Sequence, residues 1–263
     1  MIRTITVAAY RRPDYLKQVL ESLKVALENC PEYAPEHIVV GVDPGSPEEI
    51  EVTQVAMAFF PMPIDYSDPA HKIVVWPDHL GVDEHPRRLL QYAFEELHSD
   101  FNLHLEDDTV PSPDALRLAC WYHMWHAEDY NQTLCVMLCS NSVTSDQPEA
   151  VVKRSTFTPW GWGCTRRQWI EWLAPNWNSK RERPTGWDWS ISRLMSRHRL
   201  TALAPVLSRV HNIGRTRGQY QTPEGYDRDF GKQVFAGESE MRSIEEFAFD
   251  PKEPEREEWK HGD

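Results

Sequence analysis

Three consecutive carboxylates, Glu106, Asp107 and Asp108, follow the short run 101–105, in which apolar and polar residues alternate. Like charges at this spacing raise the free energy needed to ionise one another, so the cluster is unfavourable unless a positive charge lies within it. Hard divalent cations such as Mn²⁺ and Mg²⁺ prefer oxygen ligands of this kind. The triplet therefore predicts a metal site. The alternative is an acidic helix N-terminus, where carboxylates interact favourably with the helix dipole.

The triplet lies at the end of one of several predicted strands in the first half of the chain. These strands are short, largely apolar runs at 3–10, 37–43, 72–76, 101–105 and 134–138. Helical segments separate them, and this alternation predicts an α/β fold with a mostly parallel sheet and helices on both faces. Ligands bind such sheets at the carboxyl ends of the strands, where the triplet and Asp43 both fall.

The helices between these strands have start signals. Pro13 occupies the first position of a helix whose leucines and valine recur along one face. Ser46 and Glu49 have the spacing of a capping box. Ser112 is predicted to cap another helix, with Pro113 at its first position. A further helix is predicted at 84–97, and the regular alternation stops after about residue 140.

Composition narrows the class of protein. With 263 residues, 40% hydrophobic and 26% charged, the chain has the size of one large domain or two small ones with a substantial core. The five cysteines are odd in number and lack a CxxC pair, which argues against a disulfide framework or a zinc site, so we expect them to be reduced and mostly buried. No apolar run approaches the roughly 20 residues that span a bilayer, and we see no signal peptide, so we expect a cytoplasmic protein with no membrane partner.

The charge is unevenly spread along the chain. The net charge is −13, yet residues 151–220 contain 13 lysines and arginines against three acids, a net +10 that leaves −23 for the remainder. The same segment holds seven of the 11 tryptophans. A basic, aromatic-rich segment beside an acidic remainder favours an anionic ligand on that side of the protein.

The order of six motifs resembles that of the GT-A glycosyltransferases, which bind nucleotide sugars. The motifs are ITVAAYRRPDYL, VVGVDPGSP, HPRRLL, LHLEDDTVPSPDAL, FTPWGWGCTRRQW and GWDWSISRL, and together they cover roughly residues 5–218. The pattern is similar to the N-acetylglucosaminyltransferase I-like enzymes of family 13, with weaker similarity to family 2. The resemblance implies a Rossmann-like GT-A domain, with a nucleotide-sugar-binding half at 1–140, an acceptor-binding and catalytic half at 141–237, and an acidic tail at 238–263.

The resemblance assigns the triplet to the DxD-type motif of these enzymes. Asp108 would bind Mn²⁺ or Mg²⁺, which bridges the two phosphates of the donor, while Glu106 and Asp107 would contact the donor sugar or ribose. A cation there stabilises the charge that develops on the leaving nucleotide. His211 resembles a C-terminal histidine that many metal-dependent members offer as a further metal ligand; the alternative is a histidine used in packing or at the surface.

Further donor contacts are implied by other motifs. Asp43 would accept a hydrogen bond from the uracil ring, or else form an ordinary Asp-Pro-Gly turn. Arg87 would contact the nucleotide, or lie on a solvated helix face, and Arg12 is a weaker candidate of the same kind, as is Arg11. Two tryptophans flank Gly161 in the loop that would line the donor sugar and acceptor, with Trp162 on the donor side and Trp160 on the acceptor side, unless both belong to the core.

The motif GWDWSISRL resembles the segment that supplies the catalytic base of inverting enzymes. Asp188 would take the proton from the acceptor hydroxyl, with Trp187 beside the acceptor. The alternative for Asp188 is the N-cap of the helix that follows.

These roles together predict a metal-dependent inverting glycosyltransferase of the hexosyl or N-acetylhexosaminyl type with a UDP-sugar as donor. The basic segment favours DNA as acceptor, such as a hydroxymethylated base in phage-type DNA modification, flipped out of the duplex. A glycan or a lipid-linked acceptor is the alternative. A nucleotidyltransferase is disfavoured because AAYRRPDY lacks a glycine-rich phosphate loop, and a non-catalytic sugar- or nucleic-acid-binding module remains the third possibility.

Overall fold

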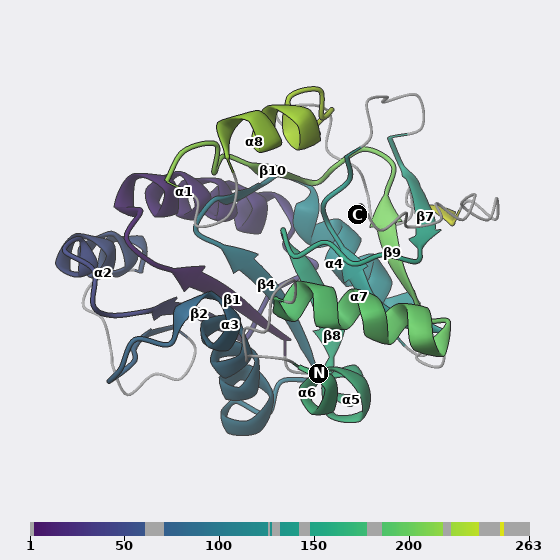
Figure 1. The fold of residues 1–263 in the computed structure, drawn as a ribbon, viewed down its shortest axis with the longest axis horizontal. Helices are drawn as coiled ribbons and strands as arrows, with labels where there is room; N and C mark the ends of the chain where they lie inside the picture. The colour runs from purple at the N-terminus through teal and green to yellow at the C-terminus, as the bar shows by residue number, and fades with distance from the viewer. Residues whose placement is uncertain are drawn as a thin grey trace.

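The computed structural model describes residues 3–60, 71–125, 127, 132–141, 148–177, 186–217, 222–236 and 248–249. The predicted acidic tail at 238–263 lies outside these residues apart from 248–249. Figure 1 shows the described elements, with the N-terminal strands and helices towards the left, most later ones towards the right, and the helix at 223–230 along the top.

Among the described residues, nine strands form one sheet in the order β11-β7-β9-β6-β8-β4-β1-β2-β3. Residues from both predicted halves, 1–140 and 141–237, lie in it. The bounds of the strands are β1 (Arg3–Ala9), β2 (His37–Val42), β3 (His71–Val75), β4 (Phe101–Glu106), β6 (Thr133–Met137), β7 (Ala150–Arg154), β8 (Trp162–Thr165), β9 (Thr201–Pro205) and β11 (Ala248–Phe249). Most neighbours are parallel, and β8 runs antiparallel between β4 and β6. The predicted α/β fold with a mostly parallel sheet is confirmed.

The register of the parallel strands aligns their carboxyl ends with one another. Ala8 of β1 lies opposite Gly41 of β2 on one side and opposite Glu106 of β4 on the other. The segments that follow these three strands therefore emerge at the same edge of the sheet. A second, two-stranded ribbon pairs β5 (Thr109–Pro111) with β10 (Val210–Asn212) just beyond that edge.

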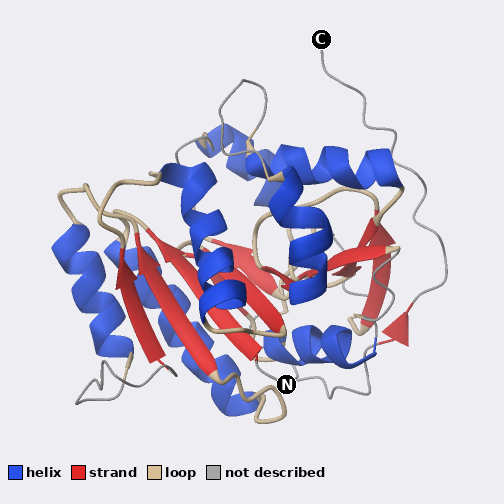
Figure 2. Cartoon of the chain, turned by 90° about the horizontal axis from the view of Figure 1, so that it is seen from below, coloured by secondary structure: helices blue, strands red, loops and turns tan. Residues whose placement is uncertain are grey.

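Helices cover both faces of the sheet, as Figure 2 shows. On one face, Ile5 and Val7 pack in a core cluster with buried residues of α1, α2 and α4, while on the other face Ala8 packs with Leu89 of α3. This alternation follows the period of two along β1. The helices are α1 (Pro13–Asn29), α2 (Glu49–Phe59), α3 (Gly81–Gln91) with a π-helical turn η1 (Tyr92–Glu96), α4 (Ala115–Trp125), α5 (Arg166–Gln168), the π-helical turn η2 (Trp169–Leu173), α6 (Ala174–Asn176), α7 (Trp187–His198) and α8 (Pro223–Phe230).

A second core cluster collects aromatic side chains from the later part of the chain. Trp162 on β8, Trp169 on η2, and Trp177 and Trp187 near the two ends of the undescribed stretch 178–185 all belong to it. The rings of Trp177 and Trp187 stack with centroids 4.6 Å apart. Four of the seven tryptophans in the basic segment are therefore part of the core.

Two predicted helix starts are wrong and one is confirmed. Helix α1 begins at Pro13 as expected. Helix α2 begins at Glu49 with Glu48 as N-cap, and the Glu49 carboxylate accepts the Gly45 N–H instead of completing a capping box with Ser46.

Helix α4 begins at Ala115, not at Pro113. The preceding residues pair as β5 with β10, and the Ser112 N–H continues this contact by donating to the Arg209 carbonyl at 2.8 Å. This pairing keeps the chain extended as far as Ser112, and Pro113 and Asp114 then form a turn before the helix begins. The Ser112 hydroxyl donates instead to Asp114 Oδ1 at 2.6 Å.

All five cysteines are buried thiols without disulfide bonds, as predicted. Within the described ranges, we find no helix with both the length and the apolar character that crossing a membrane requires.

Candidate active site

A cavity of about 830 Å³ opens at the carboxyl ends of β1, β2 and β4. Its remaining walls come from the start of α3, the segment 156–160, the start of α7 and the segment after β10. Its lining includes eight acidic or basic residues and one glycine: Arg11, Arg12, Asp43, Asp83, Glu106, Asp107, Asp108, Asp188 and Gly214. The cavity therefore brings together groups from seven separate segments of the chain.

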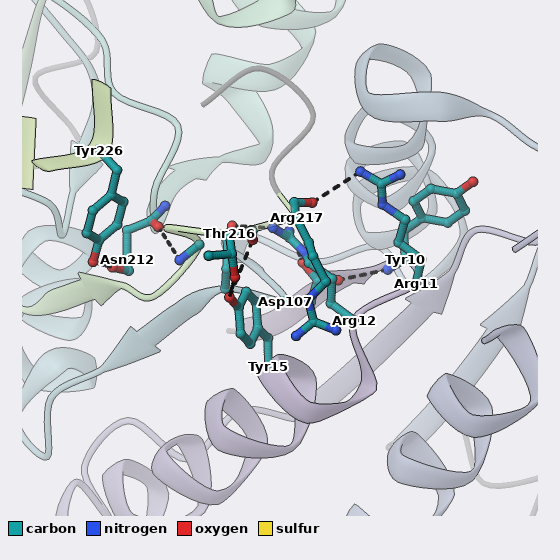
Figure 3. Close-up of polar contacts among 11 residues, drawn as sticks. Tyr10, Arg11, Arg12, Tyr15, Asp107, Asn212, Thr216, Arg217 and Tyr226 are labelled. Atoms are coloured by element: carbon teal, nitrogen blue, oxygen red, sulfur yellow. Dashed lines mark hydrogen bonds and ion pairs between the residues drawn. The ribbon is translucent and has the colours of Figure 1, made fainter. Parts of the chain in front are cut away.

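The acidic triplet holds an arginine in its midst. One guanidinium N–H of Arg12 donates to Asp107, and another donates to Asp108 Oδ2 at 2.7 Å. The second oxygen of Asp107 accepts the Tyr10 backbone N–H at 3.0 Å, a contact visible in Figure 3. Burial of Arg12 opposes its charge, but Asp107 and Asp108 outweigh burial and raise the Arg12 pKa. Arg12 is thus a fixed positive charge between the two carboxylates.

Burial raises the pKa of two carboxyl groups of the triplet, whereas it acts to lower the pKa of Arg12. It raises the pKa of Asp107 to about 6, against the lowering effect of Arg12 and with a further contribution from Asp108. It also raises the pKa of Glu106 well above the usual value, and repulsion from Asp108 adds to this. One arginine balances only part of the charge that three ionised acids would carry, so a further cation would lower the free energy of ionising them.

The donor set of the triplet fits a hard divalent cation that a phosphate ligand completes. Asp108 is 6% exposed, and its Oδ1 is buried without a hydrogen-bond partner. No cluster of three or more potential ligands from His, Cys, Asp and Glu occurs among the described residues. Mn²⁺ and Mg²⁺ commonly use one or two carboxylates and take their other ligands from substrate phosphates and water. Asp107 and Asp108 would supply such carboxylates.

Gly214 approaches the triplet from the segment after β10. A Cβ at this position would overlap Asp108 Oδ2 and lie 3.0 Å from the Asn212 side chain. The Gly214 N–H donates to the Asn212 amide oxygen at 2.7 Å. Only a glycine allows the backbone to lie this close to the Asp108 carboxylate.

Asp43 follows β2 and both caps a helix and lines the cavity. Its two oxygens accept the backbone N–H groups of Leu80 and Gly81 at 2.7 and 2.8 Å, at the start of α3. His79 Nδ1 lies 3.1 Å from the carboxylate. Carboxylate oxygens have further lone pairs, so this arrangement fixes the orientation of Asp43 and leaves room for a ligand donor.

Asp188 lies in the first turn of α7, and the predicted alternative, that it is the N-cap, is wrong. The N-cap is Gly186, and the Trp187 N–H donates to Asp83 Oδ1 at 3.3 Å. A Cβ on Gly186 would lie 2.6 Å from Asp188 Oδ1 and 3.5 Å from Asp83 Oδ1, so the two carboxylates converge on this glycine. Burial raises the pKa of Asp188, backbone N–H groups of the helix start lower it, and the charge of Asp83 raises it.

Three predicted site residues do not line the cavity. Trp162 is fully buried in the second core cluster, where it contacts Phe157 and Trp187 edge to face or tilted. Arg87 lies on α3 and pairs with Glu84 of the same helix at 2.9 Å. The His211 ring contacts the Gln233 side chain at 3.2 Å.

The position of His211 follows from strand alternation. His211 and Asn212 are successive residues of β10, so their side chains lie on opposite sides of the ribbon. Asn212 lines the cavity and His211 does not.

The two tryptophans predicted on the acceptor side, Trp160 and Trp187, both line the cavity, and Trp160 packs edge to face on Phe230.

Several cavity residues were missed at the level of sequence. His85 is the first residue of the motif HPRRLL, and Asp83 lies two residues before it. No sequence pattern distinguishes them from the neighbouring acids and histidines. His85 is buried with Nε2 lacking a partner, and burial lowers its pKa to about 4. Arg217 lies 4.7 Å from the Tyr15 ring and pairs with Asp14, and its carbonyl accepts from Arg11 (Figure 3).

No family model matches the sequence, and no curated protein matches it significantly. Solved structures do match. The mannosyltransferase PcManGT from Pyrobaculum calidifontis, in complex with GDP-Man and Mn²⁺, has a TM-score of 0.50 and 13% identity over 78% of this chain and 54% of its own. TarS 1–349 from S. aureus, in complex with UDP, has a TM-score of 0.51 and 12% identity over 79% of this chain and 58% of its own.

The chain spans less than two thirds of the length of each of these structures. At this identity the similarity defines the fold, which is a GT-A-like glycosyltransferase fold. The narrower resemblance to family 13 remains a prediction.

Proposed function

We propose that the protein is a glycosyltransferase that binds a nucleotide sugar in the cavity at the carboxyl ends of β1, β2 and β4. One observation carries the proposal: a single cavity holds the acidic triplet, Asp43 and Asp188, which come from three distant elements. The fold, shared with a mannosyltransferase in complex with GDP-Man and with TarS in complex with UDP, supports a nucleotide-sugar donor. The choice of a UDP-sugar rests on the motif resemblance.

The cavity offers separate groups for the two ends of the donor. Asp43 would accept a hydrogen bond from the base, since its orientation is fixed by the α3 backbone. Asp108 would hold Mn²⁺ or Mg²⁺, whose charge would stabilise the leaving diphosphate. Asp107, which the motif resemblance places at the donor sugar or ribose, is proposed instead as a second carboxylate ligand, because Arg12 pairs with both carboxylates. Arg217 and Arg11 contribute positive charge on the same side of the cavity.

Asp188 would act as the general base. Its carboxylate takes the proton of an acceptor hydroxyl while that oxygen attacks the anomeric carbon. The new carbon–oxygen bond forms as the bond to the diphosphate breaks, and the electron pair of that bond leaves with the nucleotide, so the configuration inverts. The raised pKa of Asp188 supports this role because a base with a higher proton affinity accepts the proton more readily.

The acceptor would face the side chains of the basic segment 151–220 that line the cavity. The DNA prediction rests on the arginines and tryptophans of the basic segment, yet four of these tryptophans are core residues and Arg209 is fully buried against Asp114. Arg215 and Arg217 are paired with Asp227 and Asp14. Trp189 lines the cavity and is 38% exposed, which suits stacking on a sugar or a base. A hydroxymethylated DNA base and a glycan or lipid-linked sugar therefore stay as competing acceptors.

The test is mass spectrometry of reaction mixtures containing a panel of UDP- and GDP-sugars, with Mn²⁺ or with EDTA. Each donor is combined with hydroxymethylated DNA, plain DNA or oligosaccharides. We expect a mass increase of one sugar on one acceptor class, and loss of that product in Asp188→Asn while UDP or GDP binding persists.

Asp227→Asn is the matched control, because Asp227 is an exposed acid paired with Arg215 away from the cavity lining. A folded wild-type protein that neither transfers nor hydrolyses any donor of the panel contradicts the proposal. Equal product with Asp188→Asn and with wild type contradicts the assignment of the base.

A further inference from the structure

Arg12 occupies the oxygens that a cation at the triplet would require. It is the N-cap of α1, three residues after the end of β1, is 14% exposed at its side chain, and pairs with Asp107 Oδ1 and Asp108 Oδ2. The other oxygen of Asp107 accepts the Tyr10 N–H. Within the described ranges, Asp108 Oδ1 is the oxygen of this pair that is buried and lacks a hydrogen-bond partner.

A guanidinium and a divalent cation compete for such a site. Both need the same carboxylate oxygens, and two positive charges at this distance repel each other strongly in a partly buried environment. Binding of a cation by Asp107 and Asp108 together therefore requires Arg12 to leave at least one of them. A buried arginine that loses its partner is unfavourable unless another anion accepts its N–H groups.

The cavity provides a place for the released side chain. Arg12 itself lines the cavity, and the Tyr15 ring lies 5.7 Å from its guanidinium carbon, a distance compatible with a cation–π contact. Arg11 and Arg217 line the same part of the cavity. A diphosphate there would be a bidentate partner for a guanidinium.

We propose that Arg12 is an internal counter-ion of the metal carboxylates, that a divalent cation displaces it, and that the displaced guanidinium binds the diphosphate of the donor. This inference rests on the proposed function and deepens it. Cation and donor then bind cooperatively. The cation releases Arg12 for the diphosphate, and the diphosphate gives Arg12 a partner in place of the carboxylates, and such coupling is reciprocal. Without the donor, Arg12 keeps the affinity for the cation low.

Cation binding without nucleotide is the primary test. The free Mn²⁺ signal in electron paramagnetic resonance gives the affinity of the purified protein for Mn²⁺ alone. We expect Arg12→Met to tighten Mn²⁺ binding about tenfold or more, because the competing charge is gone; tenfold corresponds to ~1.4 kcal/mol.

Arg215→Met is the matched control. Arg215 is an exposed arginine outside the cavity lining, and its guanidinium donates to Asp227 and not to the triplet. We expect it to change Mn²⁺ affinity by less than about twofold, since screening weakens charges that are not in contact. Asp108→Asn should abolish the tight binding that Arg12→Met creates.

The second readout is UDP affinity at saturating Mn²⁺, measured by calorimetry. Arg12→Met should weaken UDP binding because the diphosphate loses its guanidinium partner, and Arg12→Lys should weaken it less because the charge remains. If Arg12→Met proves too unstable to purify, Arg12→Lys decides by the same two criteria, since a lysine ammonium cannot bridge both carboxylates as the guanidinium fork does.

Mn²⁺ affinity in the Arg12 variants that equals or falls below that of the wild type and Arg215→Met overturns the inference. Unchanged UDP affinity overturns the second half of it. Neither result depends on sugar transfer, because no sugar donor is present. Absence of transfer contradicts the proposed function instead, and the two failures are therefore distinguishable.

Discussion

At the scale of single residues, the carboxylates of the cavity differ in what surrounds them. Asp107 and Asp108 face an arginine, Asp43 faces backbone N–H groups, and Asp188 faces a helix start and a second acid, Asp83. Environment, not residue type, therefore assigns them different tasks. Two of the groups that create these environments, Arg12 and Asp83, are themselves charged and open to substitution.

The pairing of Asp83 with Asp188 predicts a pH effect. A general base works only when ionised, so the transfer rate should fall as the pH drops through the Asp188 pKa, which lies above its usual value. Asp83→Asn removes a negative charge that raises this pKa while keeping an oxygen that accepts the Trp187 N–H. We expect the acid limb of kcat/KM to move to lower pH in this variant.

The control for that profile is Asp227→Asn, which neutralises an acid outside the cavity lining and should leave the limb in place. An unchanged limb in Asp83→Asn, with activity retained, would mean that the Asp83 charge does not act on the base. Activity lost at every pH would instead indicate that Asp83 is needed for the geometry of α7.

At the scale of elements, two glycines set how closely backbone segments approach the carboxylates. Gly214, after β10, lies against Asp108, and Gly186, before α7, lies against Asp188. Each serves one half of the proposed reaction, the first the leaving group and the second the acceptor.

Substitution of these glycines should separate the two halves. Gly214→Ala should weaken Mn²⁺-dependent UDP binding because the added Cβ displaces Asp108. Gly186→Ala should lower kcat with UDP affinity retained, because its Cβ would lie 2.6 Å from Asp188 Oδ1. Each variant is the control for the other in calorimetry and steady-state kinetics. Identical defects in both assays would show that the two glycines do not act on separate steps.

A buried ion pair ties the ribbon of β5 and β10 to the core. Arg209 is fully buried, donates to Asp114 Oδ2 at 3.0 Å, and also donates to the carbonyls of Leu207 and Pro148. The ribbon positions the segment that lies against Asp108. The pair therefore supports the site without contacting it.

We expect Arg209→Met to lower the free energy of unfolding by about 3–5 kcal/mol, since it leaves the Asp114 carboxylate buried without its partner. The double variant Arg209→Met with Asp114→Leu should recover much of that loss. Urea denaturation of the single and double variants measures both. A single variant as stable as the wild type would contradict this account of the pair.

At the scale of the whole molecule, the net charge of −13 opposes binding to a polyanion, and the basic segment 151–220 favours it. The structure reduces the weight of that segment, because several of its arginines are paired internally and most of its named tryptophans are buried.

A salt titration of duplex and single-stranded DNA binding decides between acceptor classes. If DNA is the acceptor, affinity should fall with a log–log slope of about −0.9 per phosphate contacted on a duplex, and about −0.7 on a single strand. No measurable affinity at low salt would leave the glycan and lipid-linked acceptors. Bovine serum albumin, another acidic protein, serves as a control for non-specific binding.

The sequence by itself determined the features that depend on local pattern. Strand and helix periodicity predicted the α/β sheet, and the position of polar residues directly after apolar runs placed Asp43 and the triplet at its carboxyl edge. Helix starts were predicted less well, since tertiary pairing of β5 with β10 delayed α4 to Ala115.

Only the tertiary structure decided which distant groups meet. Arg12 reaches Asp107 across 95 positions of the chain, and Trp187 reaches Asp83 across 104, contacts that no local pattern encodes. Strand alternation placed Asn212 at the cavity and His211 away from it, and core packing removed Trp162 from the site. The sequence specified a cluster of negative charge in need of a cation, and the fold supplied Arg12 as the first one.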